Sequence, residues 1–341
     1  MLLKFALKHK NYRQMRAIIC IILSAFSVGC AGQVKSQPEE VVMFWNLENF
    51  FDWTDDGTGE SDTEFSSMGV RRWTKKKFYV KCDAIAKTIL WIGDNHGSLP
   101  DVIGLAEVEN RKVLRLLLES SLLRKCGYDI VHYDSGDRRG IDVALLYNKG
   151  VYSLVESFIT TPEHEGKKLD TRDILAVRLR KAGKSQERIF IVNHHPSKYG
   201  GSKASEGRRR SVMIHLSELC DSLLKLPEKP QITAMGDFND NPYGEQFSVM
   251  DGIMVNKAVE LHEKGEGTIR YEGKWDLIDM FMVCSTLDDS TEMEIVRVPF
   301  LMTREKKHPG EKPLRTYSGP RYIGGVSDHC PIILCFYGGN S

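Results

Sequence analysis

The sequence predicts an α/β protein made of one domain, with two β-sheets packed together and helices outside them. Continuous apolar runs of strand length recur along the chain, as expected for strands buried on both faces, and segments with helical periodicity lie between them. No shift in composition marks a domain boundary after residue 41, and the chain holds no internal repeat and no low-complexity block. Many strands interleaved with a few helices are typical of sheets layered against helices around one core.

The first expected strand is the run Val41-Val-Met-Phe-Trp45. Similar runs follow at 102–105, 142–147, 174–179, 189–193, 232–235, 277–283 and 331–336. Helices are expected at 73–91, 113–123 and 205–226, because apolar side chains recur there on one face. Two stretches are expected to be loops: 52–67 is acidic and rich in turn formers, and 303–320 is basic and holds three prolines.

Composition narrows the function only slightly. The chain has 341 residues, of which 41% are hydrophobic and 27% charged, which is ordinary for a folded soluble protein. The net charge of +1 gives no global positive field toward nucleic acid, so a role on nucleic acid must rest on local arrangement. The six cysteines after residue 31 form no Cys-x-x-Cys pair and no zinc-site spacing, so we expect small buried side chains.

The N-terminal residues have the pattern of an export signal spanning 1–31. Basic residues precede an apolar run at 17–28, which is too short for a membrane span of about 20 residues. Cys30 resembles the lipidated cysteine of a bacterial lipoprotein, and ordinary cleavage after Ala31 is the alternative. We therefore expect a polar tether at 32–40 and a periplasmic, outer-membrane-anchored or secreted protein. Any contact with a membrane would run through the N-terminal lipid or an uncleaved signal.

The segment Gly236-Asp237-Phe238-Asn239 follows an apolar strand. In an extended segment, Asp237 and Asn239 point to the same side. Asp237 could orient or deprotonate a water while the amide of Asn239 donates to an oxygen of the reacting group. Hydrolysis of a phosphoester needs such a pair, because charge accumulates on the phosphoryl oxygens as water attacks. The alternative is a turn in which both side chains bond their own backbone.

The segment Ser327-Asp328-His329 precedes the last apolar run. It offers a carboxylate as a metal ligand and an imidazole as an acid or base. A neutral imidazole needs an orienting partner on its other nitrogen, and Asp279 is a candidate because it lies inside an otherwise apolar strand. A buried carboxylate without a partner is costly, so another group must compensate it. A structural salt bridge is the alternative.

Further polar residues end other strands. Asn46 and Glu48 close the first strand, and Glu107 closes the second. Carboxylates that converge from separate strands suit an oxygen-preferring cation such as Mg²⁺. Glu109 stands before Asn110-Arg111, a pattern of helix entry, so we expect it to cap a helix or lie on the surface. His194 and His195 follow another strand, although a zinc site would need more ligands at diagnostic spacing.

Together and in this order, these motifs resemble the endonuclease/exonuclease/phosphatase superfamily, which includes apurinic endonucleases, deoxyribonucleases, sphingomyelinases and inositol polyphosphate phosphatases. The resemblance runs from about Val41 to Phe336, and Gly-Asp-Phe-Asn and Ser-Asp-His-Cys-Pro are its most specific parts. It implies a four-layer sandwich, in which two mixed β-sheets packed face to face lie between helices, and a catalytic domain at 41–338. The residues carried over are Asn46, Glu48, Glu107, His194, Asp237, Asn239, Asp279, Asp328 and His329, with His195 as the alternative to His194.

The resemblance implies a role for each of these residues. Glu107, helped by Glu48 and Asp328, would hold Mg²⁺ or Mn²⁺, with Ca²⁺ as a further candidate. His329, oriented by Asp279, would share the positioning and deprotonation of water with Asp237. The side chains that would hold the phosphoryl oxygens are Asn46, Asn239 and His194.

Other segments, at 45–52, 137–144 and 171–175, resemble a bacterial subgroup of secreted members. Arg139, Arg172 and Lys198 are candidate phosphate clamps, because guanidinium and ammonium groups favour phosphate oxygens. The alternative for each is a surface cation or a salt bridge. The basic run 208–210 falls at an expected helix start, so we expect it to be solvated.

We therefore expect a metal-dependent phosphodiesterase, acting as a monomer, that hydrolyses DNA or RNA with an activated water. One alternative is a phosphatase or a diesterase of phospholipids or sugar phosphates. Another is a surface binding module that has lost turnover, against which the intact acid and histidine positions argue.

Overall fold

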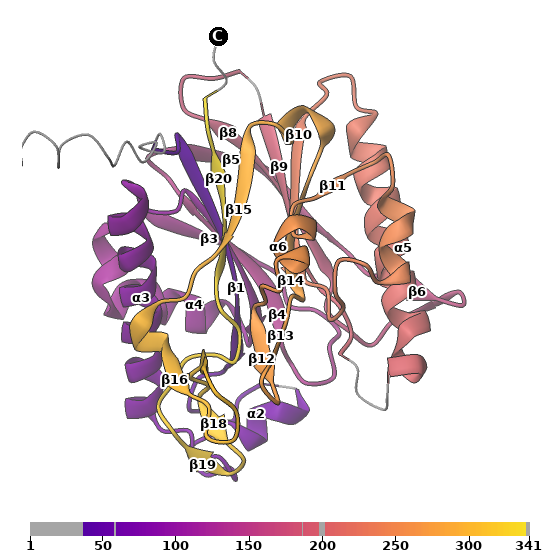
Figure 1. Cartoon of the computed structure of the whole chain (residues 1–341). Coiled ribbons are helices and arrows are strands. Elements are labelled where there is room, and N and C mark those ends of the chain that lie inside the picture. The colour runs from indigo at the N-terminus through magenta and orange to yellow at the C-terminus, as the bar shows by residue number, and fades with distance from the viewer. Residues whose placement is uncertain (1–36, 58, 186, 198–201, 339–341) are drawn as a thin grey trace, which may run out of the picture. The chain divides into compact units, whose positions relative to one another are not determined.

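Two six-stranded β-sheets form the centre of the structure and pack face to face (Figure 1). The computed structural model describes residues 37–57, 59–185, 187–197 and 202–338. The first sheet has the strand order β15 (Thr291–Ile295), β20 (Ile332–Phe336), β1 (Glu40–Phe50), β2 (Val102–Val108), β4 (Asp142–Asn148) and β3 (Tyr128–His132). The second has the order β11 (Val255–Asn256), β14 (Asp279–Val283), β10 (Gln231–Asp237), β9 (Glu187–His194), β8 (Ile174–Lys181) and β5 (Tyr152–Thr160). Both sheets are mixed, since β1 runs parallel to β2 and β9 parallel to β10 among antiparallel neighbours.

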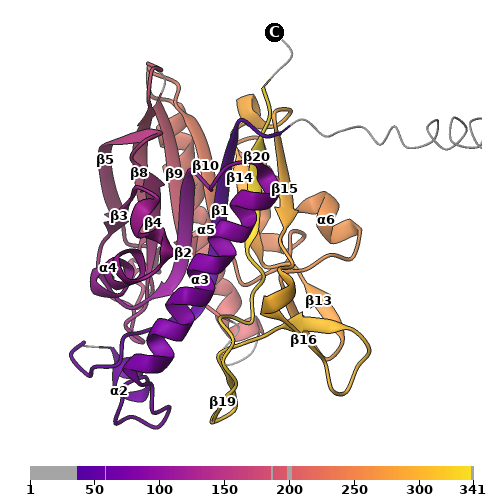
Figure 2. The same cartoon turned by 90° about the vertical axis from the view of Figure 1, so that its left-hand side faces the viewer.

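Helices cover the outer faces of both sheets. α3 (Lys75–His96) and α4 (Arg111–Ser120) lie on the first sheet and α5 (Ser202–Leu224) on the second, as Figure 2 shows from the side of α3. The short helices are α2 (Glu60–Glu64), α6 (Val259–Glu263), η1 (Leu122–Lys125), η2 (Glu245–Met250), η3 (Ser285–Leu287) and η4 (Pro299–Leu301). The small hairpins pair β6 (Glu163–His164) with β7 (Lys167–Lys168), β12 (Ile269–Tyr271) with β13 (Lys274–Asp276), β16 (Met302–Arg304) with β17 (Glu311–Pro313), and β18 (Tyr317–Ser318) with β19 (Arg321–Tyr322). The expected four-layer sandwich is confirmed.

The strand β1 contributes side chains to two hydrophobic cores, one on each face of its sheet. Its side chains alternate between the faces of the sheet, so Val42 and Phe44 lie in the core between the sheets. Val41, Met43 and Trp45 lie in the core beneath α3 and α4. Because both faces are covered, all five side chains are buried, and the run is apolar throughout rather than alternating.

The helices begin and end within a few residues of their expected positions. Before α3, the Thr74 hydroxyl accepts a hydrogen bond from the backbone N–H of Lys77 at 3.4 Å. The helix ends at Gly97, whose φ of +81° suits glycine, so α3 runs five residues past the expected end at 91.

The structure corrects the expectation for Glu109. Asn110 is the residue that caps α4, because its side chain accepts the N–H of Val113 at 3.1 Å. Glu109 is buried, and its carboxylate accepts the backbone N–H of Asp52 at 2.7 Å. Burial, acting with nearby acids, raises the pKa of Glu109 to about 8.

Two charged residues are also more buried than expected. Arg209, in the basic run expected to be solvated, is buried within α5 and donates to the Ser205 hydroxyl at 2.6 Å. Glu40, placed in the polar tether from the sequence, begins β1. Its buried carboxylate forms ion pairs with Lys181 at 2.8 Å and Arg188 at 2.7 Å.

The cysteines agree with their expected role. Five of the six described cysteines are buried, and no disulfide forms among the six. No helix within the described ranges is long and apolar enough to cross a membrane. The expected export signal with Cys30, and the phosphate-clamp candidate Lys198, lie outside the described residues.

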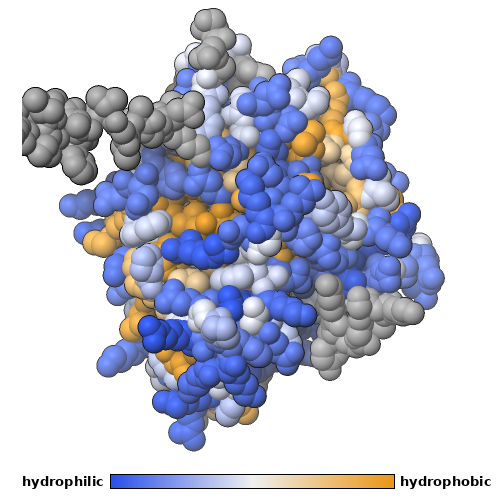
Figure 3. Space-filling model, in the orientation of Figure 1, coloured by the Kyte–Doolittle hydropathy of each residue, from blue (hydrophilic) through white to orange (hydrophobic). Residues whose placement is uncertain are grey.

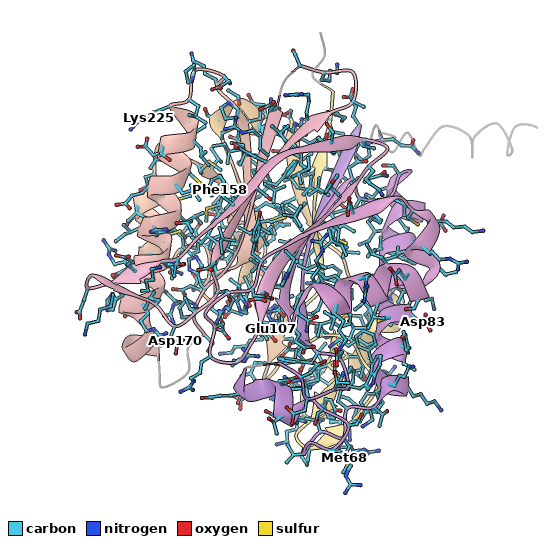
Figure 4. All side chains as sticks on the ribbon, turned by 180° about the vertical axis from the view of Figure 1, so that it is seen from behind. Met68, Asp83, Glu107, Phe158, Asp170 and Lys225 are labelled. Atoms are coloured by element: carbon cyan, nitrogen blue, oxygen red, sulfur yellow. The ribbon has the colours of Figure 1, made fainter. Side chains whose placement is uncertain are left out.

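The core between the sheets provides a stability test. Phe281 of β14 is fully buried there, whereas Phe158 of β5 is 37% exposed and is labelled in Figure 4. Phe281→Ala should lower the free energy of unfolding by about 3–5 kcal/mol, because it leaves a cavity in a closed core. Phe158→Ala should cost less than about 1 kcal/mol. Urea titration measures both, and equal losses would contradict the placement of Phe281.

Candidate active site

The expected site residues lie at neighbouring strand ends at one edge of the two sheets. In the second sheet, Asp237 at the end of β10 is paired with His194 at the end of β9 and with Asp279 at the start of β14. In the first sheet, Asn46 of β1 lies beside the end of β2, where Glu107 is found. Glu107 is labelled in Figure 4, at the lower ends of the strands. The strand registers therefore decide which polar side chains meet.

The carboxylate of Asp237 lies at the centre of the site. Its Oδ2 accepts the side-chain amide of Asn46 at 3.0 Å, and its Oδ1 accepts the backbone N–H of Asn239 at 2.9 Å. The same Oδ2 lies 3.5 Å from Nε2 of His194 and 3.9 Å from Nε2 of His329. Burial and the neighbouring acid of β14 raise the pKa of Asp237 to about 7. Near neutral pH this carboxyl can therefore either accept or release a proton.

His329 is held by one contact to its imidazole and by two to its backbone. Its Nδ1 lies 2.8 Å from Oδ2 of the buried Asp279. The Ser327 hydroxyl accepts the backbone N–H of His329 and donates to the carbonyl of Asn46, while the indole of Trp45 donates to the carbonyl of His329. Burial opposes a charge on this ring, but Asp279 and the other carboxylates raise the pKa of His329 well above its ordinary value. These carboxylates therefore favour the protonated, imidazolium form of the ring.

The two adjacent histidines have different surroundings. His194 faces Asp237, and burial together with nearby arginines lowers the pKa of His194 well below its ordinary value, so the ring is neutral. His195 points into the core, with its ring centroid 5.0 Å from that of Phe238. The carbonyl of His195 accepts a bond from Arg172. His194, and not His195, is the histidine of this pair that meets the other site residues.

Strained backbone directs several of these side chains. Glu48, Asn49, Glu107 and Asn239 all have positive φ, between +50° and +59°, in the left-handed region that favours glycine. The pairing register shifts between Asn46 and Phe50 and again between Ala106 and Val108, as in β-bulges. Such conformations persist only where surrounding contacts enforce them, and they concentrate at functional sites.

Three carboxylates, from Glu48, Glu107 and Asp328, lie near the same two cations. Nη2 of Arg315 lies 2.7 Å from Glu48 and 3.0 Å from Asp328, so it bridges them. The fully buried ammonium of Lys81 donates to the carbonyl of Glu48 at 2.7 Å and is stabilised by all three carboxylates. Burial and Asp328 raise the pKa of Glu48 to about 7.

The chemistry of these donors suits a divalent metal ion, and the ligand atoms that lie within 4.8 Å of one another at this site are those of Asp237, Asp279 and His329. Carboxylate oxygens are the ligands that Mg²⁺ and Mn²⁺ prefer in proteins. Burial opposes ionisation of Glu107, yet Arg139, His329 and the backbone N–H of Asn49 lower its pKa below the ordinary value, so it is charged. Glu107, Glu48 and Asp328 are the residues that would hold the ion.

The candidate phosphate clamps differ in exposure. The guanidinium of Arg139 is 36% exposed, lies 3.3 Å from Glu107 and donates to the side chain of Asn49 at 2.6 Å. Arg172 is buried and forms an ion pair with Asp137 at 3.0 Å, which was the alternative weighed for it. Of these two arginines, Arg139 is the one that opens to solvent beside the carboxylates.

Two site residues were missed from the sequence. Lys81 lies three residues after Phe78 and four before Ile85, on the apolar face of α3, and a lysine on such a face is a signal that could have been used. Arg315 lies in the basic loop without any periodic pattern. It reaches Glu48 across 267 residues of sequence, and nothing in the sequence indicates that contact.

The family model described as "Endonuclease/Exonuclease/phosphatase family" matches residues 41–337. The chain belongs to this family. Its enzymes are divalent-metal-dependent hydrolases of phosphoester bonds, in agreement with the carboxylates and the acid–base residues at the strand ends. A search of curated proteins gives no significant match.

Solved structures of the endonuclease/exonuclease/phosphatase fold resemble the chain over most of its length at low identity. The human Nocturnin catalytic domain with bound sulfate has a TM-score of 0.57 at 16% identity, covering 89% of this chain and 96% of that one. The Bacteroides thetaiotaomicron mannosyl-6-phosphatase has 0.55 at 15%, covering 87% and 98%. D. rerio TDP2 with single-strand DNA product has 0.53 at 13%, covering 88% and 99%. At these identities the likeness establishes the fold alone.

The pair of His329 and Asp279 can be tested by titration. In Asp279→Asn, the pKa of His329 should fall, because the nearest negative charge is removed while the hydrogen bond can remain. NMR of the imidazole resonances in EDTA measures this change, and turnover should fall by about 10²–10⁴-fold. Asp221→Asn, on the exposed side of α5, is the matched control. An unchanged pKa of His329 would contradict the pairing.

Proposed function

We propose that this chain is a metal-dependent phosphodiesterase that cleaves nucleic acid. The observation that carries the substrate choice is a basic groove that begins at Arg315, next to the carboxylates. The groove is lined by seven cationic side chains, from Arg270, Arg304, Lys306, Lys307, Lys312, Arg315 and Arg321, and by two acids, Glu272 and Glu305. This local charge contrasts with the net charge of +1 of the whole chain.

The groove suits a substrate with several phosphates in a row. Cations that line a groove bind a phosphate backbone by releasing its counterions, without reading sequence. Figure 3 shows that hydrophilic side chains predominate in the region of β18 and β19, the hairpin that contributes Arg321 to the groove. A small monoester would engage only the cations nearest the carboxylates. The bound sulfate of the Nocturnin domain and the DNA product of TDP2 support phosphate chemistry on this fold.

The metal ion and the acid–base residues would have separate roles in the reaction. When bound at Glu107, Glu48 and Asp328, the metal ion would supply Lewis-acid stabilisation to a phosphoryl oxygen. Asp237, whose pKa is raised to about 7, would take the proton of the attacking water. The imidazolium of His329, held by Asp279, would stabilise charge on the phosphoryl group or its leaving oxygen. Neutral His194 and the amides of Asn46 and Asn239 would position the phosphoryl oxygens.

Nicking of supercoiled plasmid and hydrolysis of bis-p-nitrophenyl phosphate test this proposal together. Both activities should require Mg²⁺ or Mn²⁺ and stop with EDTA, and His329→Gln should lower both by about 10²-fold or more. His262→Gln, a partly exposed histidine of α6, is the matched control and should change neither. Hydrolysis of bis-p-nitrophenyl phosphate without nicking of the plasmid would exclude nuclease activity and favour a phosphatase or a diesterase of small substrates. Neither activity in a folded protein would favour a binding module.

The groove has its own test. Lys306→Ala combined with Lys307→Ala should weaken DNA binding and lower the slope of log K against log salt by about 0.9 for each lost phosphate contact. Lys225→Ala combined with Lys264→Ala, two exposed lysines that directly follow α5 and α6, is the control for the same change in net charge. The double variant of the groove should lose more activity on DNA than on bis-p-nitrophenyl phosphate. Equal losses on both substrates would contradict a role of the groove in binding the polyanion.

A further inference from the structure

A second cluster of acids lies in the loop after β1, separate from the proposed catalytic carboxylates. Ligand oxygens of Asp52, Asp56 and Glu109 lie within 4.8 Å of one another. Asp62, at the start of α2, contacts Glu109 with its carboxyl group. Asp52, Asp62 and Glu109 are all more than nine-tenths buried, with exposures of 0%, 1% and 7%. Four carboxyl groups from two segments of the chain therefore share one largely closed site.

Protein groups form ion pairs or hydrogen bonds with only some of the carboxylate oxygens in this cluster. Lys112 lies 2.7 Å from Oδ2 of Asp52 and 2.9 Å from Oδ2 of Asp56. Backbone N–H groups serve two other oxygens: that of Asp52 donates to Oε2 of Glu109, and that of Gly57 donates to Oδ2 of Asp62. The remaining oxygens, Oδ1 of Asp62 and Oε1 of Glu109, are buried and accept no hydrogen bond from an N–H or hydroxyl donor of the described residues, so the two carboxyl groups meet only each other. Two ionised carboxylates in contact repel each other, and their desolvated oxygens need a positive partner, so the pair calls for a cation between them or for a shared proton.

We propose that Asp52, Asp56, Asp62 and Glu109 bind a Ca²⁺ ion with a structural role. Ca²⁺ accepts six to eight oxygen ligands in a flexible geometry, to which these carboxylates of a turn-rich loop would contribute, whereas Mg²⁺ demands near-ideal octahedral geometry. With the four acids ionised, Lys112 leaves three negative charges, which a divalent cation would largely neutralise. This site shares no residue with the proposed catalytic metal site and does not depend on the identity of the substrate.

The site is connected to the catalytic carboxylates through the backbone. The N–H of Glu60 donates to the carbonyl of Arg138 at 2.9 Å, and that of Ser61 donates to the carbonyl of Arg139 at 3.2 Å. Gly59 packs against the same segment, where a Cβ would come within 2.4 Å of the Arg139 carbonyl oxygen. Since Arg139 pairs with Glu107, a cation that fixes this loop would also fix the guanidinium beside the catalytic carboxylates.

Two other arrangements could satisfy the same oxygens without a metal ion. Lys112 could be the only counter-ion that the cluster needs, or Asp62 and Glu109 could share a proton. The first makes no use of Ca²⁺. The second would keep the two carboxyl groups together at low pH and push them apart when both ionise. Binding experiments with Ca²⁺ separate these arrangements from the proposed site.

The test is titration of the full chain with Ca²⁺ in the Glu107→Gln background, which removes a proposed ligand of the catalytic ion. Calorimetry should show one equivalent of Ca²⁺ bound, and the midpoint of thermal unfolding should rise with Ca²⁺. Tb³⁺ should bind at the same place and give luminescence on excitation of Trp53, which follows Asp52 in the chain. Adding Asp62→Asn or Glu109→Gln should weaken Ca²⁺ binding tenfold or more and reduce the Tb³⁺ signal. Glu64→Gln, an acid of the same helix that pairs with Arg71, should leave both unchanged.

Three results would overturn the proposal. One is absence of Ca²⁺ binding in folded Glu107→Gln protein, and another is binding that Asp62→Asn and Glu109→Gln both leave intact. The third is binding that appears only after Lys112→Met, because the lysine would then be the native counter-ion. If Glu107→Gln does not fold, Asp328→Asn provides the same background.

Discussion

The hydrogen bond from Asn46 to Asp237 joins the two sheets at the site, and the other site residues are arranged around it. Asn46 belongs to the first sheet and Asp237 to the second, so the bond fixes how far one sheet is displaced along the other. The core between the sheets maintains that position: at Gly104 the sheets approach so closely that a Cβ would lie 2.5 Å from the sulfur of Met235. Because Asp237 is buried at this junction, its pKa rises to about 7, and its two ladder neighbours, His194 and Asp279, are brought to the same point. The packing of the two sheets therefore also sets the pKa of Asp237 and the positions of its neighbours.

The backbone at the strand ends is the second constraint. A left-handed conformation costs a non-glycine residue about 1–3 kcal/mol, yet Glu48, Asn49 and Glu107 all adopt it within one small region. Hydrogen bonds between these segments hold them in place: the N–H of Glu48 donates to the side chain of Asn46 and the N–H of Asn49 to the carboxylate of Glu107. An ideal strand would send alternate side chains to opposite faces. The bulges instead gather consecutive polar residues at the sheet edge, where they face one another.

The sequence predicted the sandwich, and it predicted which polar residues would lie together at the strand ends, because both depend on short-range patterns. Apolar runs mark strands, and polar residues at the ends of neighbouring strands must meet once the sheets form. Burial of Glu109 could not be predicted in this way, because it depends on how the acidic loop after β1 folds back onto β2. The position of Arg315 at the site could not be predicted either, because its loop has neither helical nor strand periodicity. The places where prediction failed are charged residues held by loops, whose positions follow from tertiary contacts rather than from local sequence.

The cations of the site differ in how firmly they are held. Lys81 is buried beneath Glu48, and burial lowers the pKa of its ammonium to about 8, so at neutral pH it remains a counter-charge for the carboxylates. Arg315 and Arg139 are 48% and 36% exposed, and ion pairs at such exposure contribute only about 0–1 kcal/mol each. An arriving phosphate can draw either guanidinium away at little cost, whereas it cannot draw away the ammonium. When a guanidinium leaves, it frees carboxylate oxygens of Glu48, Asp328 or Glu107, the same oxygens that a metal ion would use. In the proposed mechanism, an arriving phosphate would therefore free ligands for the metal ion rather than compete with it.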